Sequence, residues 1–185
     1  MKKNQLKWTA IIAVIALGIT SCKENTPTPS NPPENETELI TTVRLVFTDT
    51  SNQTVRVASF SDIDGPGGNA PTIFDTIKLQ PNKVYKTKIY LLDETKNPVD
   101  SISNQVLTEG ADHLFVFTKT GVNLLFNMTD ADKNNLPIGL SSLWTAGANS
   151  FGSVTVVLRH QPGVKDGTVN PGETDVEIVF PCKIE

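Results

Sequence analysis

Cysteine is scarce in this sequence. The 185 residues include only Cys22 and Cys182, and aromatic residues make up 6% of the chain. A disulfide-rich scaffold is therefore excluded, because such a scaffold needs several cysteine pairs. The fold must be held together by an apolar core, which a chain of this length can supply.

Catalytic motifs are also missing. The sequence contains no Gly-x-Ser-x-Gly nucleophile elbow, no His-Glu-x-x-His zinc motif, no phosphate-binding glycine loop and no Cys-x-x-Cys pair. Gly65, Gly67 and Gly68 cluster, but Pro66 interrupts them and no helical pattern follows, which indicates a turn. These absences favour a non-catalytic protein.

The N-terminus has the pattern of a signal peptide. Three lysines among the first seven residues precede the apolar run 9–19, which is too short to span a bilayer, because a spanning helix needs about 20 apolar residues. The sequence Ile-Thr-Ser-Cys at 19–22 resembles the lipobox of bacterial lipoproteins. That resemblance implies cleavage before Cys22 and acylation of its thiol. We therefore predict a signal peptide at residues 1–21 and a lipid anchor at Cys22.

A polar segment and an acidic balance follow the predicted anchor. Residues 23–38 contain four prolines and no large apolar residue, a composition typical of a disordered tether, so the predicted tethered segment is 22–38. Without residues 1–21 the chain has 13 basic and 20 acidic side chains, a net charge of −7. This acidity argues against nucleic acid as a partner, and the lipid is the expected link to the membrane.

From Leu39 onward, apolar and polar residues alternate with period two, which predicts β-strands. Turn signals such as Pro81-Asn82 and Asn170-Pro171-Gly172 separate the segments. One helix is expected over 101–109, capped by Asp100 and stopped by Gly110. We predict an all-β domain over residues 39–185, an Ig-like or Greek-key β-sandwich of about eight strands with one short helix. The predicted strands are 42–47, 55–58, 72–79, 84–92, 113–119, 122–127, 153–160 and 175–184.

The last predicted strand places Cys182 on an apolar face. Val176, Ile178, Phe180 and Ile184 share its phase. Nothing nearby is electropositive, so we expect Cys182 to be a buried hydrophobic residue and not a reactive thiol.

Several short motifs resemble a family of small Bacteroidetes-type outer-membrane lipoproteins. They are the lipobox, the Pro/Asn-rich tether, the segment 62–68, Leu158-Arg-His-Gln-Pro162 and the ending 172–180. The resemblance covers most of residues 39–185 and implies a lipid-anchored protein of the cell outer membrane. Lys23 and Glu24 resemble part of a surface-export signal, so surface-exposed and periplasm-facing orientations both stay open. Some members carry the label of a type 1 periplasmic binding fold, which needs many crossover helices; this sequence offers one helix candidate.

Two tripeptides resemble an O-glycosylation pattern of these bacteria, an aspartate followed by Ser or Thr and an aliphatic residue. They are Asp75-Thr76-Ile77 and Asp100-Ser101-Ile102. The resemblance implies Thr76 and Ser101 as modification sites.

The two histidines are candidate metal ligands. His160 shares a phase with Val156 and Leu158, and His113 begins another predicted strand. Both rings are therefore expected at one end of the sandwich, with Asp112 or another carboxylate as third ligand to zinc or copper. The alternative is two strand-end histidines that hydrogen-bond to the backbone.

An acidic loop suggests calcium. Asp130, Asp132 and Asn134 have the spacing of the first ligands of a calcium loop. Asn135 replaces the usual turn glycine, and Ser141 stands where a bidentate Glu is expected. The alternative is an ordinary loop, because Asp and Asn suit turn geometry.

Trp144 and Phe151 are candidate contact residues. Gly139, Gly147 and Gly152 flank them, and an aromatic side chain in a glycine-rich loop can stack on a sugar or anchor a partner protein. The alternative is a lid over one end of the sandwich.

Taken together, these patterns favour a non-catalytic binding or accessory module at the cell envelope, with an outer-membrane transporter as the partner it would serve. Two alternatives stay open. One is a metal-binding lipoprotein that uses His113 and His160, and the other is a structural or adhesion component without a small ligand.

Overall fold

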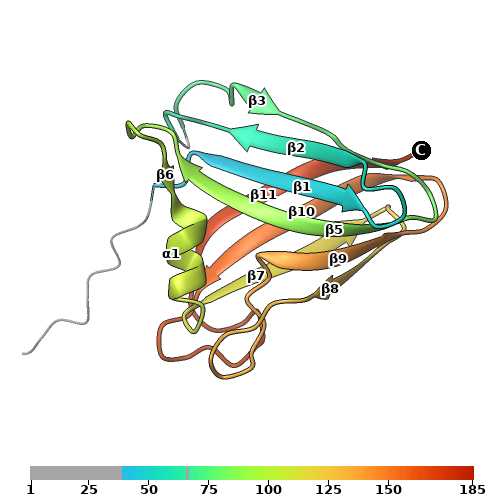
Figure 1. Cartoon of the computed structure of the whole chain (residues 1–185). Coiled ribbons are helices and arrows are strands. Elements are labelled where there is room, and N and C mark those ends of the chain that lie inside the picture. Colours follow the sequence, from blue (N-terminus) through green and yellow to red (C-terminus); the bar gives the residue numbers. More distant parts are fainter. Residues whose placement is uncertain (1–38, 66) are drawn as a thin grey trace, which may run out of the picture. The chain divides into compact units, whose positions relative to one another are not determined.

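Two β-sheets packed face to face make up the described part of the chain (Figure 1). The computed structural model describes residues 39–65 and 67–185. The predicted signal peptide, the lipidated Cys22 and the tether lie outside these residues. Among the residues described, no helix is long and apolar enough to cross a membrane.

The larger sheet has seven antiparallel strands in the order β3-β2-β1-β5-β9-β8, with β6 paired to β5. The strands β1 and β5 lie side by side near its centre. Their alternating valine, isoleucine, leucine and aromatic residues bury one face of the sheet. The strands are β1 (Thr42–Asp49), β2 (Val55–Ser61), β3 (Ile73–Phe74), β5 (Val84–Asp93), β6 (Asp100–Ser101), β8 (Leu124–Met128) and β9 (Ser141–Ala146).

The smaller sheet has four strands in the order β4-β11-β10-β7. It contains β4 (Ile77–Leu79), β7 (His113–Thr120), β10 (Ser150–His160) and β11 (Glu173–Ile184). The pair β4 and β11 is parallel, and the other pairs are antiparallel. The chain crosses between the sheets after β3, β4, α1, β7 and β9, as expected of a Greek-key sandwich.

The predicted all-β sandwich is confirmed, with eleven strands where about eight were expected. Segment 72–79 accounts for part of the difference, because it divides into β3 and β4, which belong to different sheets. The division falls at Asp75, whose carboxylate accepts a hydrogen bond from the backbone N–H of Ser59 at 2.9 Å. That side chain ties the crossing chain to β2.

The one helix among the described residues, α1 (Ile102–Thr108), lies within one residue of each predicted end. Its N-cap residue is Ser101; Asp100, the expected cap, lies in β6. Ile102 and Val106 are buried in the core, and the Ser103 hydroxyl accepts a hydrogen bond from the Leu91 N–H at 2.6 Å. The helix therefore packs against β5, and the chain leaves it toward the start of β7 (Figure 1).

The core lies between the sheets and is built from the inward faces of the longer strands. Cys182 belongs to it, as expected, and burial raises the pKa of its thiol to about 11. The buried side chains include Val43, Leu45, Phe47, Tyr85, Ile89 and Leu91 from the larger sheet, and Ile77, Leu79, Phe115, Val154, Val156, Leu158, Ile178, Phe180, Cys182 and Ile184 from the smaller one.

Trp144 belongs to this core, and its prediction as a loop contact residue was wrong. It lies on β9, which the sequence interpretation missed, and it is fully buried. Its indole packs on the rings of Phe47, Phe117 and Phe126, with centroids 5.2, 5.5 and 4.6 Å away. Its Nε1–H donates to the Ser142 hydroxyl at 2.9 Å, which satisfies its polar atom. Gly139 and Gly147 lie just outside the two ends of β9, and Gly152 lies within β10.

Candidate metal centre

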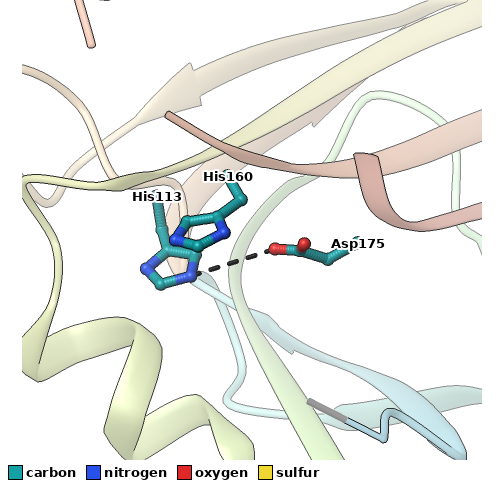
Figure 2. Close-up of side chains that lie close together, drawn as sticks. All are labelled: His113, His160 and Asp175. Atoms are coloured by element: carbon teal, nitrogen blue, oxygen red, sulfur yellow. Dashed lines mark ion pairs between the residues drawn. The ribbon is translucent and has the colours of Figure 1, made fainter. Parts of the chain in front are cut away.

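Three neighbouring strands bring His113, His160 and Asp175 together at one end of the smaller sheet (Figure 2). His113 is the first residue of β7 and His160 the last residue of β10. The two are direct partners in the antiparallel register of these strands, which places their side chains next to each other on the same face. The predicted meeting of the two histidines is thus present in the structure.

A β-bulge brings Asp175 onto that face. The register between β10 and β11 shifts at Leu158/Arg159, where Arg159 pairs with Thr174 and Leu158 pairs with Val176. Asp175 is therefore the extra residue between two paired ones. In a regular strand it would point away from the core, because Val176 points inward. A bulge changes the direction of a side chain in this way, and bulges are frequent next to functional sites.

The three side chains converge without bonding directly. Their nearest potential ligand atoms lie within 4.8 Å of one another. The Nε2 of His113 is 3.9 Å from Oδ2 of Asp175, longer than a hydrogen bond. The imidazole rings are stacked with centroids 4.8 Å apart and planes 7° from parallel. Within residues 39–65 and 67–185, this is the one group of three metal-ligating side chains that comes so close.

His113 is held as a metal-binding histidine usually is. Its Nδ1 lies 3.2 Å from the carbonyl oxygen of Glu109, at the end of α1. When Nδ1–H donates to that carbonyl, the lone pair of Nε2 is free, and Nε2 faces Asp175. A backbone carbonyl behind the ring is a common arrangement in metal sites, because it fixes both the tautomer and the orientation.

Burial is the main cause of the pKa shifts of His113 and Asp175. It lowers the pKa of His113 below its ordinary value of 6.5, and the His160 ring lowers it further, against the opposing effects of the Glu109 carbonyl and Asp175. His113 is therefore neutral at pH 7 and offers a lone pair. Burial also raises the pKa of Asp175, with the two histidines and Arg159 acting in the opposite direction. Both groups would gain from a cation placed between them.

This donor set suits a divalent transition metal. Neutral imidazole nitrogen and carboxylate oxygen are ordinary ligands of zinc and copper. A tetrahedral zinc ion holds its ligand atoms about 3.4 Å apart, so these atoms would have to close by roughly 1 Å. One ring would also have to turn, because a metal ion lies in the plane of each imidazole that binds it. His160 is partly buried, whereas His113 is buried.

Asp112 is not part of this cluster, so its prediction as third ligand was wrong. Its backbone carbonyl accepts a hydrogen bond from the Gln161 N–H at 2.6 Å, and its Oδ1 faces the Gly163 N–H at 3.4 Å. Asp112 thus ties the start of β7 to the end of β10. It supports the backbone beneath the two histidines.

The calcium prediction for Asp130, Asp132 and Asn134 conflicts with the structure. The Asp130 carboxylate accepts hydrogen bonds from the N–H groups of Gly139 and Ser141 at 2.8 and 3.0 Å. Asp132 Oδ1 accepts the N–H groups of Asn134 and Leu136, and its Oδ2 lies 3.0 Å from Nζ of Lys165. These protein donors occupy the oxygen atoms that a calcium ion would need. The positive charge that balances Asp132 is the ammonium group of Lys165.

The remaining predicted sites lie apart from one another. Phe151 is on the outward face of β10 and is 81% exposed, so it is available for contact. Thr76 lies between β3 and β4, and Ser101 precedes α1; both are partly buried. Their glycosylation and the role of Phe151 stay predictions.

Comparison of the chain with models of known protein families, with curated proteins and with solved structures finds no match. The function must therefore be argued from the site itself.

Proposed function

We propose that this protein is a non-catalytic, lipid-anchored module of the bacterial outer membrane whose β-sandwich binds a divalent transition-metal ion through His113, His160 and Asp175. The observation that carries the metal-binding part is the convergence of two imidazole rings and a carboxylate, from three adjacent strands, without a direct hydrogen bond between His113 and Asp175.

Three features support a metal ion over a simple polar cluster. The Glu109 carbonyl directs His113 Nε2 toward Asp175. The lowered pKa of His113 removes the proton that would otherwise compete with a metal. The bulge carries an acidic side chain inward, although an ionised carboxylate in a half-buried position costs free energy unless it meets a cation.

Zinc and copper fit this donor set best. The site offers two nitrogen ligands, one oxygen ligand and no thiolate. It therefore does not suit magnesium or calcium, which prefer oxygen ligands alone. Three protein ligands leave a coordination position for water or for an exogenous ligand. Such a site suits capture and transfer of an ion, which agrees with a module that serves an outer-membrane transporter.

Calorimetric titration of the purified full-length protein with zinc tests the proposal. We expect one ion per chain in the wild-type protein, and an affinity lower by at least about tenfold in a His113→Ala/His160→Ala variant. Asp112→Asn is the matched control: it removes a neighbouring negative charge outside the cluster but keeps the backbone carbonyl and the Oδ1 acceptor that tie β7 to β10, so zinc affinity should be unchanged. Equal heats in the wild-type and double-histidine proteins would refute the proposed site.

The lipid anchor rests on the lipobox and needs its own test. Cells labelled with radioactive palmitate should incorporate label into the wild-type chain and not into a Cys22→Ala variant. Label that enters both proteins equally would overturn the anchor, and the outer-membrane location would lose its basis.

A further inference from the structure

Arg159 lies beside the bulge, on the face of the smaller sheet opposite the metal centre. It is the residue at which the register of β10 and β11 shifts. Its neighbour His160 points toward the site, so alternation along β10 directs Arg159 to the outer face. From there its guanidinium reaches the segment that immediately precedes Asp175.

Three hydrogen bonds join Arg159 to that segment. Nη1 donates to the Thr174 hydroxyl at 2.5 Å, and Nη2 donates to the carbonyl oxygens of Gly172 and Pro171 at 2.6 and 3.2 Å. All three acceptors lie within four residues of Asp175. The planar, rigid fork of a guanidinium fixes several acceptors at once, which a lysine ammonium does not do in the same way.

The same segment also lies against the backbone of His160. Gly172 has a φ of +78°, and a Cβ atom built on it would lie 1.9 Å from the His160 carbonyl oxygen. The backbone of Gly172 is therefore packed directly onto a residue of the site. Arg159 and His160 together confine residues 171–174, so the bulge that follows has little freedom to relax.

We propose that Arg159 is a positioning residue of the metal centre: by holding residues 171–174 it fixes the bulge that turns Asp175 toward His113 and His160. This inference rests on the proposed metal-binding function. It assigns to an arginine that contacts no ligand atom the task of keeping the carboxylate in place.

Two other roles of Arg159 predict different behaviour. If Arg159 acted only through its positive charge near Asp175, lysine would replace it without loss. If it served only stability, its removal would weaken zinc binding by the same factor with or without the Asp175 carboxylate. A positioning role requires instead that the effect depend on Asp175 and on the shape of the guanidinium.

The test is a double-mutant cycle on the full-length protein, titrated with Co²⁺ and followed by its visible absorption. Cobalt replaces zinc in such sites, and its d–d bands respond to the number and type of ligands. The proteins are wild type, Arg159→Lys, Asp175→Asn and the double variant. Arg44→Lys, on the other sheet, is the matched control for loss of a guanidinium, and the melting temperature of each metal-free protein checks folding.

We expect Arg159→Lys to weaken Co²⁺ binding by about tenfold and to change the bands toward those of Asp175→Asn. In the Asp175→Asn background the lysine should change the affinity less than twofold. If Arg159→Lys does not fold, Thr174→Val removes one acceptor with little change in shape and should reproduce the spectral change with a smaller loss of affinity.

The outcomes separate the two claims. A wild-type protein that binds no Co²⁺ and no Zn²⁺ refutes the proposed function, and the inference with it. A wild-type protein that binds the metal while Arg159→Lys keeps its affinity and spectrum refutes the positioning role alone. So does an equal loss of affinity with and without the Asp175 carboxylate.

Discussion

Lys165 Nζ lies 3.0 Å from Oδ2 of Asp132, and both side chains are almost completely buried. The same ammonium donates to the carbonyl oxygen of Gly110 at 2.7 Å. Lys165 thus joins three loops at the end of the sandwich that carries the candidate metal centre. Burial opposes the charge of Asp132, but the Lys165 ammonium and the amides of Leu136 and Asn134 outweigh it and lower the pKa of the carboxyl group.

Breaking this ion pair should destabilise the protein. Asp132→Asn leaves the Lys165 charge buried without its partner, and the expected cost is about 3 kcal/mol in the free energy of unfolding. Urea denaturation of the wild-type and variant proteins measures it. Calcium should leave the melting temperature of the metal-free wild-type protein unchanged; a rise with calcium would show that the loop binds calcium after all.

Trp144 and Phe151 give a contrasting pair of large aromatic residues. Trp144→Ala removes the centre of the aromatic core and should cost about 3–5 kcal/mol. Phe151→Ala changes a side chain that is 81% exposed and should change stability by less than about 0.5 kcal/mol. Chemical denaturation distinguishes the two. Similar losses in both variants would contradict the assigned burial.

Gly172 should be sensitive to the smallest substitution. Gly172→Ala places a Cβ on the His160 carbonyl and requires a left-handed φ from an alanine, which together should cost about 1–3 kcal/mol. Zinc affinity should fall as well, because the end of β10 has to move. Gly163→Ala is the matched control: its φ of +68° imposes a similar backbone cost, but its Cβ meets nothing within 4 Å. An unchanged zinc affinity in Gly172→Ala would contradict the close packing on the site.

The stability of the metal-free protein should depend on the protonation of His113. The folded state lowers the pKa of His113 below its unfolded value of about 6.5, so the unfolded chain binds more protons in the window from pH 6.5 down to the folded pKa. Stability therefore falls as the pH falls through that window and is fully present above it. Asp175, whose pKa is raised, acts with the opposite sign between its unfolded pKa of about 3.8 and its raised folded pKa, because the folded state there binds the extra proton.

Urea denaturation at pH 7.5 and pH 6 measures the effect of His113. The wild-type protein should be less stable at the lower pH, and His113→Gln should lose less stability over the same interval. The His113→Gln variant shares every other titrating group with the wild type, so it isolates the histidine. Identical pH dependence in the two proteins would show that His113 gains its proton equally in both states.

The fold could be predicted from sequence to the extent that period two is visible in single strands. The alternation in Thr42–Asp49 and Glu173–Ile184 shows plainly which face is buried. The strand Ser141–Ala146 has the same alternation, with Ser142, Trp144 and Ala146 inward, but the glycines at 139 and 147 suggested a loop. The glycines predicted a loop here, whereas the alternation of Trp144 with its neighbours would have predicted the strand.

Two of the three residues of the candidate site could also be predicted. The phases of His113 and His160 place both rings on an inward face, and strand ends bring them together. Asp175 could not be found in this way, because its phase in a regular strand directs it outward. Only the bulge reverses that direction, and a bulge is a property of the pairing between two strands. Asp112 was therefore chosen wrongly as third ligand: it is next to His113 in sequence, whereas the carboxylate that reaches the site comes from another strand, β11.

The most direct test of the central claim is to measure the melting temperatures of the wild-type protein and of Asp175→Asn, each with and without zinc. Without metal, Asp175→Asn should melt no lower than the wild type, because it removes a half-buried charge that makes no close ion pair. With zinc at one hundred times its Kd, the wild type should gain about 2.7 kcal/mol, or roughly 5–10 °C, and the variant little of it. A wild-type protein that zinc does not stabilise, or a variant stabilised equally, would contradict a metal centre at His113, His160 and Asp175.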